Sequence, residues 1–437
     1  MPFGRQAGQR RCPVGLCGPR EDFRAEGNAE LVVSSSLPRS AIDFDPYSEA
    51  YFNSPYEIYR RLRDEAPVYY SPKHDFWALS RYEDVAPAYK DFETYSSARG
   101  FSLDTVQDPN RRDDYPVILV MDPPQHNRMR KLVSKVFTPR AIQGLEQMVR
   151  ETIEGYANRL NPKRFDAVGD FAAHFPMDVI ANMLGVPAED RQQIRLWLDT
   201  MLERQPGTAG QTPEGVEAGI STGAYYYNLV QQRRQDPQDD MISRLLETTI
   251  VEEGTERRLD DIEITGFASV LGGAGAETVT KLIGTAAVAF ADSPEQWEEL
   301  RNDRSKISAA VEELIRYEGP SQYNVRYSLR DVTVHGITIP AGSAVMLING
   351  SANRDERMFA DPDRVDIHRQ RPVGYNLGFG FGIHSCLGAA LARMESRIAL
   401  DVLLDLIPEY RIDRSGLRRV NMVNVMGWSA VPVRAPI

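Results

Sequence analysis

One long apolar segment near the middle of the chain restricts the possible folds more than any other feature. Asp260 or Asp261 can cap a helix there, with Glu263 in its first turn, and Pro294 follows its end. About 30 residues at ~1.5 Å each give a helix of ~45 Å, which is long enough to cross a whole domain. Because the segment is apolar on most sides, it predicts a central, buried helix.

Glycines interrupt the middle of this segment, at Gly272, Gly273 and Gly275. Each glycine destabilises a helix by roughly 1 kcal/mol relative to alanine. The run therefore predicts that either another helix or a flat ligand approaches the backbone closely at this point.

Composition excludes several classes of protein. The net charge of −11 argues against nucleic acid or an anionic membrane as the main partner, because both need a basic surface. No stretch of ~18 apolar residues is present, which favours a soluble chain over a membrane-spanning one. Three cysteines in 437 residues fit a reducing compartment, so we expect a cytoplasmic protein.

The first 41 residues are expected to form a disordered N-terminal arm, and residues 42–437 a single domain. The first 20 contain four arginines and no acidic residue, which is also typical of a mitochondrial presequence. The glycines and prolines of this segment and its lack of serine argue against a presequence. A translation start site placed too far upstream is a second alternative to the disordered arm. Cys12 and Cys17 have no further ligands beside them and fall short of a metal site.

Helical patterns dominate the remainder of the chain, and strand-like runs form a smaller part. The sequence therefore predicts a mainly α fold with a smaller β portion. The strand-like runs are Val68–Tyr70, Phe76–Ser80, Val332–Ile339 and Ala344–Asn349.

A glycine-rich loop near the C-terminus contains Cys386. It reads Phe-Gly-Phe-Gly-Ile-His-Ser-Cys-Leu-Gly over residues 379–388, and a helix is predicted from Leu387 to about Leu406. A lone cysteine held by glycines indicates a thiolate that binds a metal beside a large, flat group, and haem iron is the best candidate. A buried free cysteine is the alternative.

This loop resembles the haem-binding signature of the cytochrome P450 family, Phe-x-x-Gly-x-x-x-Cys-x-Gly. The resemblance extends from about Ile42 to Val433 and implies a cytochrome P450 fold, with a long central helix over haem b. It implies Cys386 as the axial iron ligand. Phe379, Gly380 and Gly388 would contact the cofactor, with Gly380 and Gly382 turning the loop tightly.

A second motif of the family is matched by Glu313 and Arg316. At a spacing of three residues they share one helix face and can pair, which alone would be read as a surface ion pair. The resemblance implies a buried, structural pair that a third residue completes. Arg364 or Arg369 could supply it, and the sequence leaves both open.

A third motif lies within the glycine run of the long helix. Ala274-Gly275-Ala276-Glu277-Thr278 resembles the acid–alcohol pair of the family. Ala274 and Gly275 would leave room for O2, while Glu277 and Thr278 would be catalytic by handling protons. An ordinary capping pair or a solvated face is the alternative, but a carboxylate within an apolar helix favours a function.

The resemblance also assigns four cationic residues to the haem propionates. His126 and Arg130 stand four residues apart on one predicted helix face. Arg326 and His384 occupy matching positions later in the chain. Taken alone, a histidine or arginine at any of these positions would more often be a surface residue than a propionate ligand.

The implied reaction is that of a monooxygenase, R–H + O2 + 2e⁻ + 2H⁺ → R–OH + H2O, giving hydroxylation or O-dealkylation. Electrons would come from NAD(P)H through a ferredoxin reductase and a ferredoxin. A basic patch around the cysteine would steer an acidic ferredoxin, although these residues could be ordinary solvated helix faces. The patch comprises Arg128, Lys131, Lys135, Arg393 and Arg397.

By analogy with the family, mainly apolar residues would line the substrate pocket, which implies a small, hydrophobic organic substrate. Arg111 and Arg112 could meet a substrate carboxylate. A peroxide-dependent peroxygenase and a non-enzymatic haem-thiolate sensor remain alternatives, and neither needs the acid–alcohol pair. The pocket candidates are Phe101, Leu103, Ile118, Leu119, Val270, Val325 and Met426.

Overall fold

Helices dominate the computed structural model, which describes residues 42–110, 117–134, 137–252, 255–370 and 375–436. The expected arm at residues 1–41 lies outside these ranges. The α-helices are α1 Glu49–Asn53, α2 Tyr56–Glu65, α3 Tyr82–Ala88, α4 Leu103–Val106, α5 Gln125–Val133, α6 Pro139–Gln143, α7 Glu146–Ala157, α8 Phe175–Leu184, α9 Arg191–Leu202, α10 Pro213–Gln235, α11 Met241–Glu247, α12 Asp261–Ala291, α13 Pro294–Asn302, α14 Ile307–Glu318, α15 Asn349–Ala352 and α16 Ala389–Leu406.

Strands form the smaller part of the fold, which confirms the predicted class. The four strand-like runs of the sequence correspond to β1, β2, β8 with β9, and β10. The strands are β1 Val68–Ser71, β2 Phe76–Leu79, β3 Tyr95–Ser96, β4 Arg164–Asp166, β5 Thr249–Glu252, β6 Thr255–Arg258, β7 Asn324–Ser328, β8 Val332–Val334, β9 Ile337–Ile339, β10 Ala344–Leu347, β11 Arg411–Ile412, β12 Arg418–Arg419, β13 Trp428–Ala430 and β14 Pro432–Arg434.

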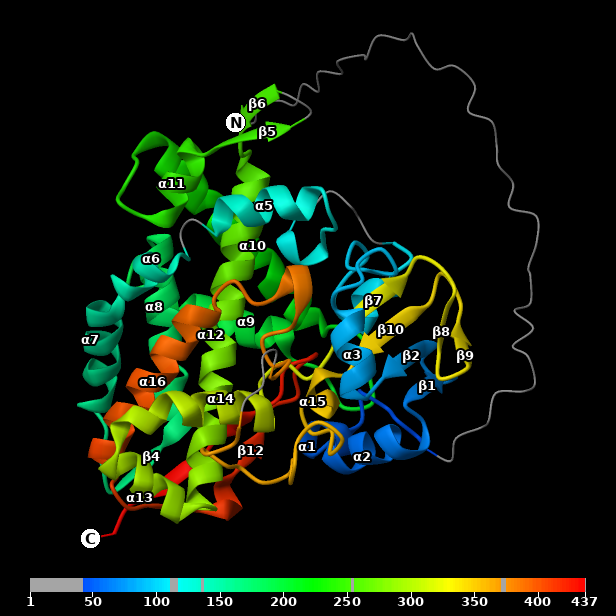
Figure 1. Ribbon diagram of the computed structural model, residues 1–437. Coiled ribbons are helices and arrows are strands. Elements are labelled where there is room, and N and C mark those ends of the chain that lie inside the picture. The colour runs from blue at the N-terminus through cyan, green and yellow to red at the C-terminus, as the bar shows by residue number, and fades with distance from the viewer. Residues whose placement is uncertain (1–41, 111–116, 135–136, 253–254, 371–374, 437) are drawn as a thin grey trace, which may run out of the picture. The chain divides into compact units, whose positions relative to one another are not determined.

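The largest sheet has the strand order β1-β2-β10-β7-β3 and lies beside α1, α2 and α3 (Figure 1). Strand β10 runs parallel to β2 and antiparallel to β7. In β7, Arg326 pairs in register with Val345 of β10, and Val325 pairs with Met346. This register fixes the position of Arg326, which is one of the predicted propionate ligands.

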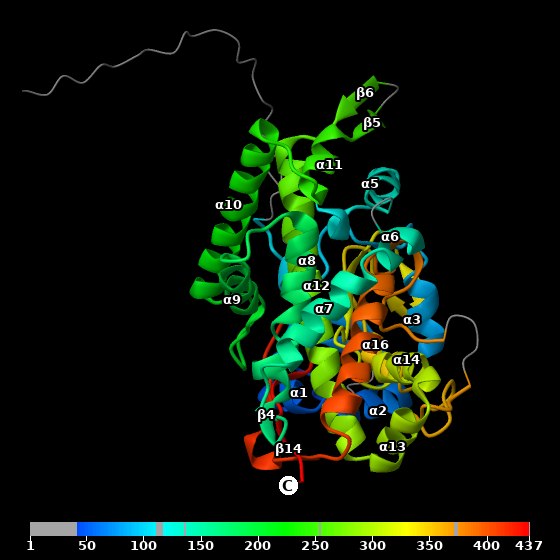
Figure 2. The ribbon, with the colours of Figure 1, turned by 90° about the vertical axis from the view of Figure 1, so that its left-hand side faces the viewer.

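Helix α12 runs through the middle of the helical part of the fold (Figures 1 and 2). Asp260 is its N-cap: the Asp260 side chain accepts from the backbone N–H of Glu263, and the Glu263 side chain accepts from that of Asp260. Most of its side chains are buried. The predicted long central helix is therefore confirmed, with Asp260 rather than Asp261 as the cap. In the described residues, no helix combines the length and apolar character needed to span a membrane.

Neighbouring helices account for the glycines in α12. A methyl group on Gly272 would lie 2.3 Å from the hydroxyl of Tyr226 on α10. One on Gly273 would lie 3.2 Å from Leu198 of α9, and one on Gly275 would lie 3.1 Å from Ile180 of α8. Of the two alternatives that the sequence left open, close approach of other helices is therefore the one observed at these glycines.

The Glu313–Arg316 pair is buried, as the second motif predicted. Arg316 donates to both carboxylate oxygens of Glu313, at 2.7 and 2.9 Å, and both side chains are 0% exposed. Arg369 completes the network, because its Nε lies 3.0 Å from Glu313 Oε1. Arg364 contributes only its backbone carbonyl, which accepts from Arg316 at 3.2 Å. Tyr375 adds a hydrogen bond to Glu313 at 2.8 Å.

Candidate active site

The loop before α16 turns sharply at the predicted glycines. Gly380 and Gly382 have φ angles of 68° and 72°, in the region that glycine adopts most readily. A methyl group on Gly382 would also lie 2.5 Å from the carbonyl oxygen of Tyr89. The backbone N–H of Cys386 donates to the carbonyl of Phe379 at 2.8 Å, which closes the loop. The expected tight turn is confirmed.

Cys386 is a free cysteine that can be reached by solvent. A pocket of about 380 Å³ between α14 and α16 reaches it. Although solvent reaches its surface, the protein atoms packed around Cys386 raise the pKa of its thiol, while a backbone hydrogen bond from Gly388 and the charges of Arg130 and Arg393 oppose this rise. Nearby cations and backbone N–H groups stabilise a thiolate, which is the form that binds metals.

Open space lies beside both α12 and the start of α16, two helices that pack on each other. Ala274 is exposed although it stands in the middle of a buried helix. Thr278, one turn later, is half-buried, and its hydroxyl donates to the carbonyl of Ala274 at 2.9 Å. A methyl group on Gly388 would meet no atom within 4 Å. A flat group can therefore lie against Ala274, Thr278 and Gly388, whereas the α-carbon of Gly275 faces Ile180 instead.

The four predicted propionate ligands gather in one cluster. The rings of His126 and His384 are 4.3 Å apart, centroid to centroid. Burial lowers the pKa of His384 to about 3, and the charges of Arg326, His126 and Arg130 act in the same direction. Burial also lowers the pKa of Arg326 and of Arg130. Elements far apart in the chain, α5, β7 and the cysteine loop, therefore bring the four side chains together.

Within the described residues, no carboxylate forms an ion pair with Arg130 or Arg326, although the charge of Asp122 acts on His126 and Arg326. The Nε2 atoms of His126 and His384 are buried and have no hydrogen-bond partner. Buried donors without acceptors are unfavourable, so a group that carries two carboxylates would complete the cluster. The residues present therefore fit a haem whose propionates lie at this position.

Glu277 lies on a different face of α12 from Thr278. It is 2% exposed, and Lys281, one turn later, places its Nζ 2.8 Å from Glu277 Oε2. Asp199 of α9 lies close enough to Glu277 for the two carboxyl groups to influence each other's pKa. Asp199 was not singled out from the sequence, where it reads as one half of an ordinary i, i+4 surface pair with Arg195.

The substrate candidates differ in how much surface they present. Leu103 and Val325 are 1% and 0% exposed, because they pack in the aromatic-rich cluster around the large sheet. Phe101, Leu119 and Val270 are half-buried and so have surface left for a ligand. Ile118 and Met426 are buried as well. Arg111 and Arg112 lie outside the described residues.

The predicted basic patch is weaker than the sequence suggests. Arg393 pairs with Glu312 of α14 and stacks on Phe379, with its guanidinium 4.5 Å from the ring centroid. Lys131 is exposed on α5, and Arg128 and Arg397 are half-buried. Lys135 lies outside the described residues.

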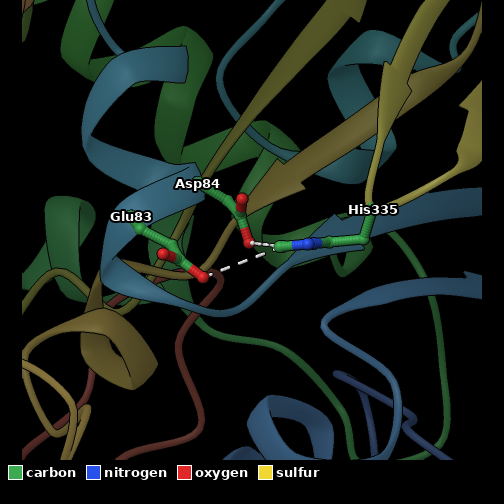
Figure 3. Close-up of side chains that lie close together, drawn as sticks. All are labelled: Glu83, Asp84 and His335. Atoms are coloured by element: carbon green, nitrogen blue, oxygen red, sulfur yellow. Dashed lines mark hydrogen bonds and ion pairs between the residues drawn. The ribbon is translucent and has the colours of Figure 1, made fainter.

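A separate cluster of ionisable groups lies at the sheet edge. His335 Nε2 is 2.9 Å from Asp84 Oδ2 and 4.0 Å from Glu83 Oε1 (Figure 3). The ligand atoms of these three residues lie close enough together to hold a metal ion. No other such group was found in the described ranges. The hydrogen bond between His335 and Asp84 is sufficient to explain this arrangement, because it ties the β8–β9 hairpin to α3.

The sequence is similar to known cytochromes P450 over most of its length. The family model described as cytochrome P450 matches residues 223–406. A Mycobacterium tuberculosis chain named cytochrome P450 123 is 41% identical over 391 residues, which are 89% of this chain and 96% of that one. Vitamin D(3) 25-hydroxylase of Pseudonocardia autotrophica is 37% identical over 401 residues, again 89% and 96% of the two chains.

Solved structures show the same similarity. A mutant of P450 EryK in complex with erythromycin B matches with a TM-score of 0.80 and 31% identity, over 88% of this chain and 96% of that one. CYP109E1 from Bacillus megaterium in complex with testosterone matches with a TM-score of 0.79 and 31% identity, over 88% and 99%.

Proposed function

The chain belongs to the cytochrome P450 family of haem b monooxygenases, and from this premise we propose that it oxidises a mainly hydrophobic organic substrate by hydroxylation or O-dealkylation. When bound, the haem supplies the activation of O2, which none of the twenty side chains can supply alone. The observation that carries the proposal is the cluster of His126, Arg130, Arg326 and His384 beside the Cys386 loop, whose arginines form no ion pair within the described residues.

In this proposal, the Cys386 thiolate would bind the haem iron, and its strong electron donation would support the activation of O2. Gly388, Arg130 and Arg393 oppose the effect of burial on its pKa and so favour the thiolate. The two propionates of the haem would be held by His126, Arg130, Arg326 and His384.

Thr278 and Glu277 handle protons. The Thr278 hydroxyl borders the open surface at Ala274 and can exchange its hydrogen bond to the Ala274 carbonyl for one to a reacting oxygen. Glu277, one residue from Thr278, has a buried carboxylate beside Lys281 that can accept a proton and pass it on. This pair distinguishes the proposal from a peroxygenase or a ligand sensor.

The substrate is proposed to be a small, mainly hydrophobic organic molecule rather than a macromolecule. Accessible apolar surface is provided by Phe101, Leu119 and Val270, which are only half-buried. The names of the relatives refer to vitamin D3, testosterone and erythromycin B, which all have large carbon skeletons. Steroids, terpenoids, macrolides and aromatic acids form a suitable panel, and a spin-state shift on binding identifies the class.

Electrons are proposed to come from NAD(P)H through a ferredoxin reductase and a ferredoxin, with the protein in the cytoplasm. Exposed Lys131 on α5 favours an acidic partner. Arg393 contributes less, because Glu312 already pairs with it. Binding of ferredoxin should therefore weaken with added salt and with Lys131→Glu.

Replacement of the proposed ligand tests the proposal. The reduced, CO-bound protein should show the red-shifted Soret band of a thiolate-ligated haem, and Cys386→Ala should lose it. An unchanged band in Cys386→Ala would refute the assignment of the ligand.

The acid–alcohol pair is tested with Thr278→Ala, which should divert electrons from product to hydrogen peroxide. Thr265→Ala is a matched control, because Thr265 makes the same i−4 hydrogen bond to Asp261, at 2.6 Å, near the start of α12. Full coupling of electrons to product in Thr278→Ala would contradict the proposed role. Turnover with hydrogen peroxide alone, at the rate obtained with ferredoxin, would favour the peroxygenase alternative.

A further inference from the structure

Two adjacent stripes of α12 face different surroundings. Gly273, Glu277 and Lys281 are spaced by four residues and lie on one side, where Leu198 of α9 approaches Gly273. Ala274 and Thr278 form the neighbouring stripe, which faces the open space. Glu277 therefore connects the reaction side of α12 with α9.

Asp199 of α9 meets Glu277 at this contact. Asp199 Oδ1 is buried and accepts a hydrogen bond from no N–H or O–H donor in the described part of the chain. Ionised carboxylates only accept hydrogen bonds, so a bond between Asp199 and Glu277 requires one proton on the pair. Burial, with the negative charge of Glu277, raises the pKa of Asp199 to about 8, which places this proton on Asp199 near neutral pH.

Each of the two carboxyl groups has its own cation. Arg195 Nη1 lies 2.7 Å from Asp199 Oδ2, and Lys281 Nζ lies 2.8 Å from Glu277 Oε2. A proton that moves between the two carboxyl groups leaves one carboxylate and two cations in either state. Whichever group is ionised keeps a cation beside it, while the raised pKa of Asp199 and the lowered pKa of Glu277 keep the proton on Asp199 at rest.

We propose that Asp199 is the acid that resupplies Glu277 with protons during turnover. The step is Asp199–COOH + Glu277–COO⁻ → Asp199–COO⁻ + Glu277–COOH, in which one O–H bond breaks, another forms and no electrons move. Asp199 then takes a new proton from water, since its side chain is 29% exposed although Oδ1 is buried. The inference rests on the proposed role of Glu277 beside Thr278.

The other elements around α9 leave this pair undisturbed. Helix α10 contacts the end of α9 through Gly215 and Gly219, which carry no charge. At the start of α8, His174 Nδ1 lies 3.1 Å from Gln192 Oε1, which accepts from Arg195 Nε at 2.9 Å. His174 and Gln192 thus hold Arg195 in place rather than compete for Asp199. A movement of α9 away from α12 would separate Asp199 from Glu277, so proton supply requires α9 to be packed on α12.

Infrared spectroscopy of the haem-loaded resting protein tests the shared proton directly. With ¹³C-labelled aspartate, the carbonyl stretch of a protonated carboxylic acid should shift, and it should disappear in Asp199→Asn. The label separates Asp199 from Glu395, whose buried carboxyl group is also expected to be neutral. Asp190→Asn is the matched control, because Asp190 caps the start of the same helix and accepts from Tyr225 at 2.7 Å. Absence of a protonated aspartate in the parent protein would overturn the inference.

Turnover measurements test the role of the proton. Asp199→Asn should slow product formation by about tenfold or more and enlarge the solvent isotope effect, with substrate affinity and the CO spectrum unchanged. Asp190→Asn should behave like the parent. If Asp199→Asn forms product at the rate of the parent while Glu277→Gln forms it slowly, the inference is wrong but the proposed function is unaffected. Parent-like rates in both variants would overturn the role of Glu277 and the inference together.

Discussion

Gly272 offers the sharpest test of how α12 and α10 pack. We expect Gly272→Ala to destabilise the protein, although alanine is the better helix former. The added methyl group would lie 2.3 Å from the hydroxyl oxygen of Tyr226 and 3.2 Å from the ring carbon that carries it. Tyr226 is 0% exposed, so its ring has no free space to enter.

Two opposing effects set the expected magnitude. A Gly→Ala change in a helix stabilises by about 1 kcal/mol, whereas overpacking a core destabilises by about 1–3 kcal/mol. The net change for Gly272→Ala is therefore a loss of up to about 2 kcal/mol. Tyr226→Phe removes a buried hydroxyl that has no partner among the described residues, so it should leave stability unchanged or raise it by about 1 kcal/mol.

The assay is urea denaturation of the haem-loaded protein as a double-mutant cycle. In the Tyr226→Phe background, Gly272→Ala should lose less stability or gain some, which gives a coupling energy of about 1–3 kcal/mol between the two positions. Gly223→Ala on α10 is the matched control, because its methyl group would meet no atom within 4 Å. It should stabilise by about 1 kcal/mol.

An increase in stability of Gly272→Ala equal to that of Gly223→Ala would refute the reasoning. The same conclusion would follow from a coupling energy of zero with Tyr226→Phe, because the clash would then have no part in the effect.

Two further predictions concern buried carboxyl groups. Arg369→Leu should lower stability by about 3 kcal/mol, since it removes one cation from the buried Glu313. Arg364→Leu is its control and should change little, because Arg364 offers this network only its backbone carbonyl; equal losses would refute the assignment of Arg369. Burial holds the pKa of Glu395 well above its ordinary 4.5, so the native state keeps a proton that the unfolded state releases, and stability falls as pH rises past that value. Glu395→Gln should therefore be more stable than the parent at about pH 8 but not at about pH 4, as thermal melts can show.

Local patterns were sufficient for the parts of the site that lie close together in sequence. The Cys386 loop, the Asp260 cap and the Glu313–Arg316 pair each depend on residues within one loop or one helix turn, and their geometry follows the prediction. The position of Arg326 was predictable only through the family resemblance, because β7 brings it to His384 from a distant part of the chain.

Contacts between distant elements explain what the sequence left open. Arg364 and Arg369 have the same chemistry, and only the path of the chain after α14 decides which reaches Glu313. The sequence did not indicate a role for Asp199, because its i, i+4 spacing from Arg195 is typical of a solvated helix face. The buried Oδ1 of Asp199, which has no donor in the described part of the chain, can be recognised only when its neighbours from α12 are known.

The clustered cations of the propionate site should make the stability of the protein in a cell depend on haem. Without haem, the Nε2 atoms of His126 and His384 have no hydrogen-bond partner, and no carboxylate in the described ranges forms an ion pair with Arg130 or Arg326, whose charges both act on His384. A ligand that binds only the folded chain stabilises it in proportion to the logarithm of its concentration. The abundance of this protein should therefore increase with haem supply, because newly made chains without haem are less stable and are degraded faster by proteases.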